Sequence, residues 1–98
     1  MTKAVPTQYV DNDRVRVTAW RFAPGSATGW HRHEYDYVIT PVTDGDVEIE
    51  DANGARIPFR MEAGVSYFRN AGVEHDVINA GSSELVFVEV ELKVGADG

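Results

Sequence analysis

Turn signals recur along this chain so closely that no helix of ordinary length fits between them. The signals are Pro24-Gly25, Asp44-Gly45, Asn53-Gly54, Ala63-Gly64, Ala71-Gly72 and Gly81-Ser82. A spacing of about 8–12 residues, which holds from Gly45 onward, is typical of short antiparallel strands in a sandwich or barrel. Residues 15–22 and 37–42 agree, because both are rich in β-branched and aromatic side chains. The sequence therefore predicts an all-β domain.

The dipeptide Asn53-Gly54 is the strongest hairpin signal in the chain. It follows residues 47–50, in which apolar and acidic side chains alternate as they do in a half-buried strand. A two-residue type I′ turn needs positive φ at both central positions, and asparagine and glycine tolerate this conformation best. We expect a hairpin with a type I′ turn at this point.

The segment from Leu85 to Leu92 predicts a long strand with two unlike faces, because successive side chains of a strand point to opposite sides. One face is wholly aliphatic: Val86, Val88, Val90 and Leu92. The other begins apolar and ends in two carboxylates: Leu85, Phe87, Glu89 and Glu91. We expect the aliphatic face to pack in the core and the acidic face to be solvated, since strand glutamates usually are. The alternative is that the acidic face lines the mouth of a barrel.

Length and composition fit one compact domain. The 98 residues are 43% hydrophobic and 26% charged, which is globular composition. We expect an N-terminal arm over residues 1–12, a barrel over 13–93 and a tail over 94–98. The chain has no cysteine, which excludes disulfides, thiolate nucleophiles and cysteine-ligated metals. A metal with other ligands, or a homodimer in which residues 5–10 extend a partner's sheet, remains as reinforcement.

The charge argues for a small-molecule partner. With 9 basic and 16 acidic residues the net charge is −7, and the cations are scattered, so nucleic acid and anionic membrane surfaces are poor partners. No stretch of about 18 apolar residues occurs, and the N-terminus has no apolar run of signal-peptide length. We expect a cytoplasmic protein.

All three histidines lie in two turn-bounded segments, residues 25–33 and 64–75. Residues i and i+2 of an extended chain point the same way, so His31 and His33 can present two imidazoles to one point. His75, from an adjacent strand, would complete a set suited to a divalent metal. Neutral imidazole binds iron, zinc, nickel and copper, so the ligands alone do not choose the ion. The alternative is that these are ordinary surface histidines in loops.

Residues 25–79 resemble the two signature motifs of the cupin superfamily. The first motif is matched by Gly25, His31, His33 and Gly45, and the second by Gly64, Gly72, His75 and Asn79. Asn70 stands where the second motif usually has proline. The resemblance implies a small antiparallel jelly-roll β-barrel, with one divalent metal held inside by His31, His33 and His75 and the substrate entering at one end.

One departure from the family pattern concerns the fourth ligand. Where the family places a glutamate, this chain has Tyr37, whose phenol is a poor ligand because its pKa is near 10. Glu34 and Asp36 have the wrong parity to face the histidines on a regular strand, although a bulge could turn either one inward. We expect a three-histidine site with Tyr37 as the catalytic residue that donates a hydrogen bond beside it. Three neutral imidazoles leave the full +2 charge, which favours an anionic chelating substrate.

Other residues around this site are candidates for binding substrate. Tyr67 and Trp30 would line an apolar pocket, and Arg69 would hold a substrate carboxylate. We expect Trp20 and Phe68 to pack in the core. Two acids are expected to orient a histidine by accepting its second ring N–H: Asp36 and Asp76.

The chain also resembles small bacterial single-domain cupins, some of which carry a β-alanine degradation label, through residues 20–25, 28–33 and 36–38. The three-histidine set is similar to that of the diketone-cleaving and thiol dioxygenases, which implies ferrous iron, with Zn²⁺, Ni²⁺ or Mn²⁺ as alternatives. Our first hypothesis is a non-haem iron dioxygenase acting on a small anionic or enolisable metabolite, or an isomerase, cyclase or hydrolase with another metal. The second is a non-catalytic binding or sensing module accessory to a catabolic pathway, and the third is a dimeric scaffold that binds no ligand.

Overall fold

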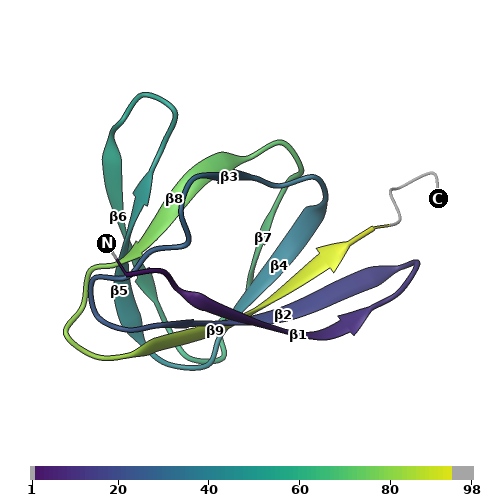
Figure 1. The fold of residues 1–98 in the computed structure, drawn as a ribbon, viewed down its shortest axis with the longest axis horizontal. Helices are drawn as coiled ribbons and strands as arrows, with labels where there is room; N and C mark the ends of the chain where they lie inside the picture. Colours follow the sequence, from purple (N-terminus) through teal and green to yellow (C-terminus); the bar gives the residue numbers. More distant parts are fainter. Residues whose placement is uncertain (1, 94–98) are drawn as a thin grey trace.

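The computed structural model describes residues 2–93, which contain β-strands joined by turns and loops and no helix (Figure 1). The all-β prediction is confirmed, and the expected tail at 94–98 lies outside the described residues. The strands are β1 (Val5–Asp11), β2 (Val15–Phe22), β3 (His31–Arg32), β4 (Asp36–Pro41), β5 (Gly45–Glu50), β6 (Arg56–Met61), β7 (Tyr67–Arg69), β8 (Glu74–Asn79) and β9 (Leu85–Leu92). Accordingly, none of these residues belongs to an apolar helix of membrane-spanning length.

The strands form two antiparallel sheets that face each other (Figure 1). One sheet has the order β1-β2-β9-β4-β7 and the other the order β3-β8-β5-β6. The chain changes sheet between β2 and β3, β3 and β4, β4 and β5, β6 and β7, β7 and β8, and β8 and β9, which is how a jelly roll is built. The predicted jelly-roll fold is therefore confirmed.

The apolar core is built around two phenylalanines. Phe22 of β2 is 0% exposed and its ring lies 5.3 Å from that of Phe87 on β9. Ile39, Val47, Met61 and Leu85 pack around this pair and are buried.

The prediction for the faces of β9 was wrong. The face that points inward carries Leu85, Phe87, Glu89 and Glu91, all less than 9% exposed, whereas the valines between them are half-buried on the outside. β9 lies between β2 and β4, so one face is enclosed by the opposite sheet. Glu91 is tolerated there because Arg16 of β2 donates to both its carboxylate oxygens, at 2.8 and 2.7 Å.

The predicted hairpin joins β5 to β6, but its turn is not type I′. Gly54 has a φ of +79°, while Asn53 has no positive φ. The carboxylate of Asp51 instead accepts hydrogen bonds from the backbone N–H groups of Asn53 and Ala55, at 2.9 and 3.1 Å. The aspartate side chain thus fixes a longer turn, in which only the glycine needs the left-handed conformation.

The residues expected as an N-terminal arm form β1, which pairs with β2 of the same chain at the edge of the larger sheet. Every residue of β1 is exposed, and Tyr9 is 71% exposed.

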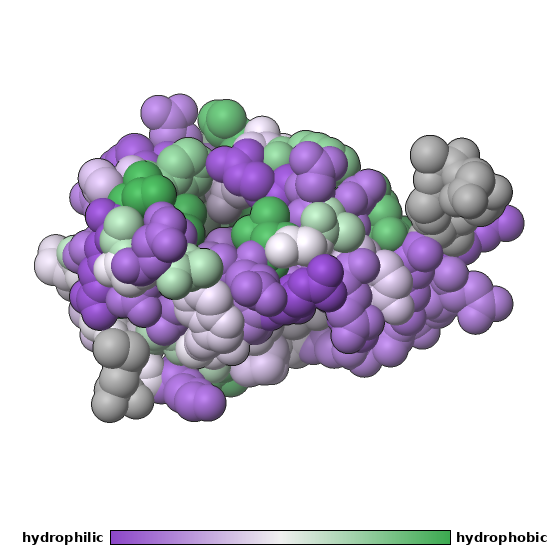
Figure 2. Space-filling model, turned by 90° about the horizontal axis from the view of Figure 1, so that it is seen from above, coloured by the Kyte–Doolittle hydropathy of each residue, from purple (hydrophilic) through white to green (hydrophobic). Residues whose placement is uncertain are grey.

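The face seen in Figure 2 is mainly hydrophilic, with hydrophobic groups set among polar ones. The histidine-lined interior is therefore the more specific feature of the molecule.

Candidate metal centre

Two neighbouring strands and one loop bring the three histidines together. His31 on β3 is the direct cross-strand partner of His75 on β8. His33 lies just beyond the end of β3, where its N–H donates to the carbonyl of Val73 at 2.9 Å and its own carbonyl accepts from the N–H of Gly72 at 2.8 Å. These backbone hydrogen bonds hold His33 in place, so its side chain points the same way as that of His31, as the His-x-His spacing predicted.

The ring nitrogens of the three histidines converge. The Nε2 atom of His33 lies 3.0 Å from Nε2 of His31 and 3.1 Å from Nε2 of His75. The Nδ1 atom of His31 lies 2.8 Å from the carbonyl oxygen of Gly29, which can only accept. The proton of His31 is therefore on Nδ1, and its Nε2 presents a lone pair to the other two rings.

This arrangement fits a bound divalent cation. Two nitrogens about 2.1 Å from one ion and at right angles around it lie about 3.0 Å apart, close to the separations here. Without an ion between them, three ring nitrogens this close together do not have enough protons to satisfy one another by hydrogen bonds. The carbonyl of Gly29 plays the part of the hydrogen-bond partner that orients a metal-binding imidazole. The three histidines are thus a candidate metal site.

Burial keeps two of the rings neutral. It lowers the pKa of His33 to about 4, with a further contribution from His31, and it lowers the pKa of His75 to about 3, with contributions from His31, His33 and Arg69. Neutral imidazole is the form that binds metals. These two rings therefore keep their lone pairs available to a cation in mildly acidic solution.

These pKa shifts predict how the stability of the metal-free protein depends on pH. The unfolded chain takes up protons at His33 and His75 below about pH 6.5, and the folded chain does not, so their contribution to stability falls as the pH drops from 6.5 towards 4. Burial, with the help of Glu91, raises the pKa of Glu89 to about 7, and this contribution falls as the pH rises from 4.5 to 7. Between pH 4.5 and 6.5 the two effects oppose each other. We expect Glu89→Gln to lose stability more steeply than the wild type as the pH falls through this range, in melting temperatures measured with a chelator present; equal slopes would contradict the assignment.

Tyr37 of β4 lies against the candidate metal site. Its ring stacks on that of His33 with centroids 3.8 Å apart and an angle of 16° between the planes. It is 2% exposed, and among residues 2–93 its hydroxyl is the buried side-chain polar atom without a hydrogen-bond partner. Burial, with Tyr67 and Glu89, raises the pKa of Tyr37 well above its ordinary value, so the phenol keeps its proton. The hydroxyl is available to a ligand.

The unpartnered hydroxyl makes Tyr37→Phe an informative variant. A desolvated hydroxyl without a partner stabilises nothing, so we expect its removal to leave the free energy of unfolding unchanged or to raise it by up to about 1 kcal/mol. Ligand binding should weaken at the same time. Chemical denaturation measures the first effect, and Tyr9→Phe at the exposed sheet edge is the matched control, expected to change neither. A loss of more than about 1 kcal/mol in Tyr37→Phe would show that the hydroxyl is already bonded in the protein.

A cavity of about 630 Å³ opens beside the three histidines, within the range of small-molecule sites. Of the residues predicted to bind substrate, Tyr67 and Arg69 line it, with the Arg69 guanidinium 4.6 Å from the centroid of the Tyr67 ring. Burial raises the pKa of Tyr67 to about 12. Trp30 is 50% exposed and lies outside the cavity lining. The structure therefore brings together two of the three predicted binding residues.

The two residues expected in the core behave differently. Trp20 packs against the core and also lines the cavity. Phe68 is 49% exposed, so the prediction for it was wrong. The reason is parity, since β7 has three residues and turns its two outer ones, Tyr67 and Arg69, towards the cavity.

The two aspartates expected to orient a histidine have other partners. The carboxylate of Asp76 accepts from the N–H of Gly29 at 3.1 Å, and that of Asp36 accepts from the N–H of Ala71 at 2.8 Å. Asp76 thereby holds the loop whose Gly29 carbonyl accepts the proton of His31. Its effect on the histidine is indirect, through the backbone.

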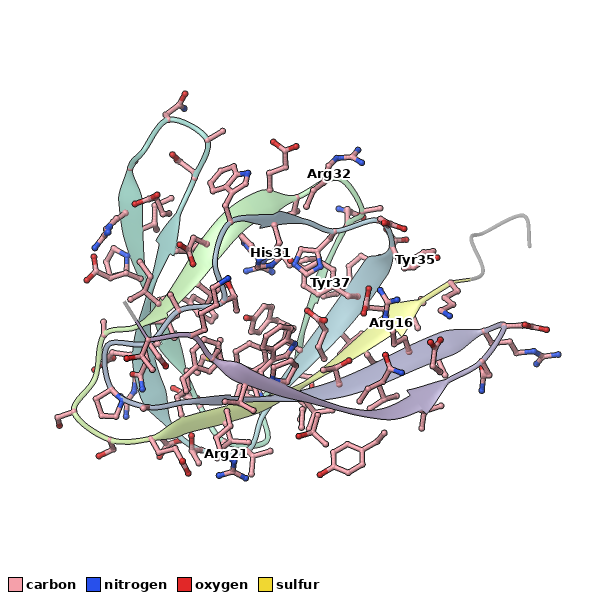
Figure 3. The ribbon with its side chains drawn as sticks, viewed as in Figure 1. Arg16, Arg21, His31, Arg32, Tyr35 and Tyr37 are labelled. Atoms are coloured by element: carbon pink, nitrogen blue, oxygen red, sulfur yellow. The ribbon has the colours of Figure 1, made fainter. Side chains whose placement is uncertain are left out.

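The cavity has an acidic wall, which the sequence analysis held as the alternative for the acidic face of residues 85–92. Glu89 and Glu91 of β9 and Arg16 of β2 all line it, and Oε2 of Glu89 lies 3.9 Å from Nδ1 of His33. Figure 3 shows His31, Tyr37 and Arg16 directed into the same interior, while Arg21 and Arg32 point away from it. The signal for this alternative was the pair of glutamates on a face that also carries Leu85 and Phe87, and the part of Arg16 was not predicted.

Comparison with known proteins identifies the fold family. The Cupin domain family matches residues 18–91, which include all three histidines. The chain belongs to the cupin family. This cupin is 57% identical over 91 residues to the β-alanine degradation protein BauB of Pseudomonas aeruginosa, covering 93% of this chain and 95% of that protein. It is also 33% identical over 70 residues to the oxalate-binding protein of Thermotoga maritima, covering 71% of this chain and 55% of that protein.

Solved structures agree with the family. A cupin domain from Bordetella pertussis matches with a TM-score of 0.91 and 50% identity, covering 95% of this cupin and 96% of that chain. The polyketide cyclase RemF of Streptomyces resistomycificus matches with a TM-score of 0.71 and 18% identity, covering 94% of this cupin and 66% of that chain. At that identity the second match speaks for the fold alone.

Proposed function

We propose that this cupin is a metal-dependent enzyme that oxidises a small carboxylate metabolite, with His31, His33 and His75 holding one ferrous ion. The observation that carries the proposal is the convergence of three Nε2 atoms on one side of a cavity large enough for a small substrate. The chemistry that a bound ferrous ion supplies is stabilisation of an anionic substrate oxygen and electron transfer to dioxygen. Three neutral ligands leave the ion's charge uncompensated, which favours an anionic substrate.

The cavity residues have defined parts in this proposal. Tyr37 donates its unpartnered hydroxyl to the substrate, and the raised pKa keeps that proton in place. Ile39, Phe87 and Trp20 give the cavity apolar walls that exclude water from the reacting group. The relative that is named for β-alanine degradation supports a short carboxylate with a functional group at the β-position.

Oxygen uptake by the iron-loaded protein tests this function. We expect consumption above the buffer rate with at least one member of a panel of short β-oxo carboxylates, β-diketones and thiols, and none in His75→Ala. The competing function is a binding module, which the oxalate-binding relative favours. Saturable binding of oxalate to the metal-loaded protein, without oxygen uptake or product from any member of the panel, would establish the binding module instead.

We also propose that two copies of this cupin pair through β1. The strand lies at a sheet edge with unpaired backbone groups on one side, and its apolar residues Val5 and Tyr9 are 59% and 71% exposed. Light scattering of the wild type should give the mass of a dimer, and Val5→Lys with Tyr9→Lys should give a monomer, because charges block edge pairing. A double variant that stays dimeric would place the interface elsewhere, and a monomeric wild type would reject the dimer.

A further inference from the structure

Glu89 is a buried carboxyl group without a cationic partner in the wall of the cavity. It is 8% exposed, it lies within hydrogen-bonding reach of the Trp20 side chain, and its Oε2 atom lies 3.9 Å from Nδ1 of His33. Arg16 is already held by both oxygens of Glu91. A buried carboxyl group without a cationic partner costs stability, and a leucine or valine at this position would not carry that cost. The arrangement therefore indicates a ligand that brings a positive charge to Glu89.

The surroundings of Glu89 suit a cation more than a neutral donor. Trp20, Tyr37 and Tyr67 line the same cavity, and aromatic rings attract positive charge. The Tyr37 hydroxyl is an unpartnered polar group in the same wall, 2% exposed, and its oxygen can also accept a hydrogen bond. One part of the cavity is thus prepared for an ammonium group, and the three histidines prepare another for an anion-binding metal.

We propose that the cavity takes a short amino carboxylate, with its carboxylate at the histidine-held metal and its ammonium group at Glu89. This inference rests on the metal site of the proposed function. Glu89 then acts as the residue that selects the substrate, because a chain without the ammonium group would leave its carboxyl unpaired. The number of carbons between the two charged groups follows from the separation of the metal and Glu89.

Calorimetric titration of the Co²⁺-loaded protein tests the proposal with matched pairs of ligands: glycine and acetate, β-alanine and propionate, γ-aminobutyrate and butyrate. We expect the amino member of one pair to bind about tenfold or more tightly than its partner. Glu89→Gln should abolish that preference while leaving the affinity for the plain carboxylate within about threefold. Glu84→Gln, an exposed glutamate paired with Arg21, is the matched control and should keep the preference.

Each other outcome has a definite meaning. An amino preference that survives in Glu89→Gln shows that the amine chelates the metal directly, and it overturns the proposal. Equal affinity for both members of every pair overturns it as well, while leaving the metal site intact. No difference in carboxylate binding between Co²⁺-loaded and metal-free protein rejects the proposed function itself. If Glu89→Gln does not fold, Glu89→Asp keeps the charge and withdraws it by one carbon, so the preferred ligand should become one carbon longer.

Discussion

The His75→Ala variant should fail to retain a divalent ion that the wild type binds at one equivalent per chain. Removal of one of three ligands leaves two imidazoles. The affinity for the ion should therefore fall by more than the factor of about 10 to 100 that is lost when only the hydrogen-bond partner of a ligand is removed. Elemental analysis after loading with Co²⁺ and dialysis measures the stoichiometry. His31→Ala and His33→Ala should behave in the same way, because all three Nε2 atoms face one point.

The control for this experiment is Tyr37→Phe. The phenol stacks on His33, and we expect it to donate a hydrogen bond and not to bind the ion, so this variant should keep one equivalent of Co²⁺. If His75→Ala also keeps one equivalent at unchanged affinity, the ion is held somewhere else and the assignment of the centre is wrong. Parallel loss in Tyr37→Phe would mean that the tyrosine oxygen takes part in binding.

The second large effect concerns the apolar core around Phe22. Phe22→Ala should lower the free energy of unfolding by about 3–5 kcal/mol, because its ring is fully buried against Phe87 and its removal leaves a cavity. A domain of this size has about 5–15 kcal/mol in total, so the variant would be close to unfolding at ambient temperature. Urea denaturation followed by tryptophan fluorescence gives the difference directly.

The chain offers a matched control for this substitution. Phe68→Ala removes the same ring from a position that is 49% exposed, and the expected loss is below about 1 kcal/mol. Equal losses in the two variants would contradict the burial described for Phe22. A metal-loaded sample should show the same ranking at higher absolute stability, because an ion that binds only the folded state stabilises it.

The sequence was sufficient to predict the features that depend on local spacing. Two histidines two residues apart on an extended chain point the same way, and turn signals at short intervals leave only strands between them. These rules predicted the convergence of His31 and His33 and the all-β fold without any knowledge of the tertiary structure. The pairing of His31 with His75 required the family motifs, since it joins segments that are distant along the chain.

The features that the sequence did not predict depend on which sheet covers which face. Alternation along β9 divides its residues into two sets, but it does not say which set lies inside. Glu89 and Glu91 are inside because the opposite sheet covers them, and one of them finds Arg16 across β2. The exposure of Phe68 has the same origin, since Tyr67 and Arg69 on either side of it turn towards the cavity. The conformation of the Asn53-Gly54 turn depended on Asp51, a side chain outside the dipeptide.

The shortness of β3 has a consequence for the order in which this corner of the barrel becomes rigid. β3 is a two-residue strand at the edge of its sheet and is joined to β8 by the pairs His31 with His75 and Arg32 with Glu74. So short a pairing between β3 and β8 opens readily by itself, whereas a cation bound by all three rings would stabilise its closed form. Metal occupancy of the site and protection of the β3 amides from hydrogen exchange would then rise together, and this corner of the barrel would become rigid only when the ion binds.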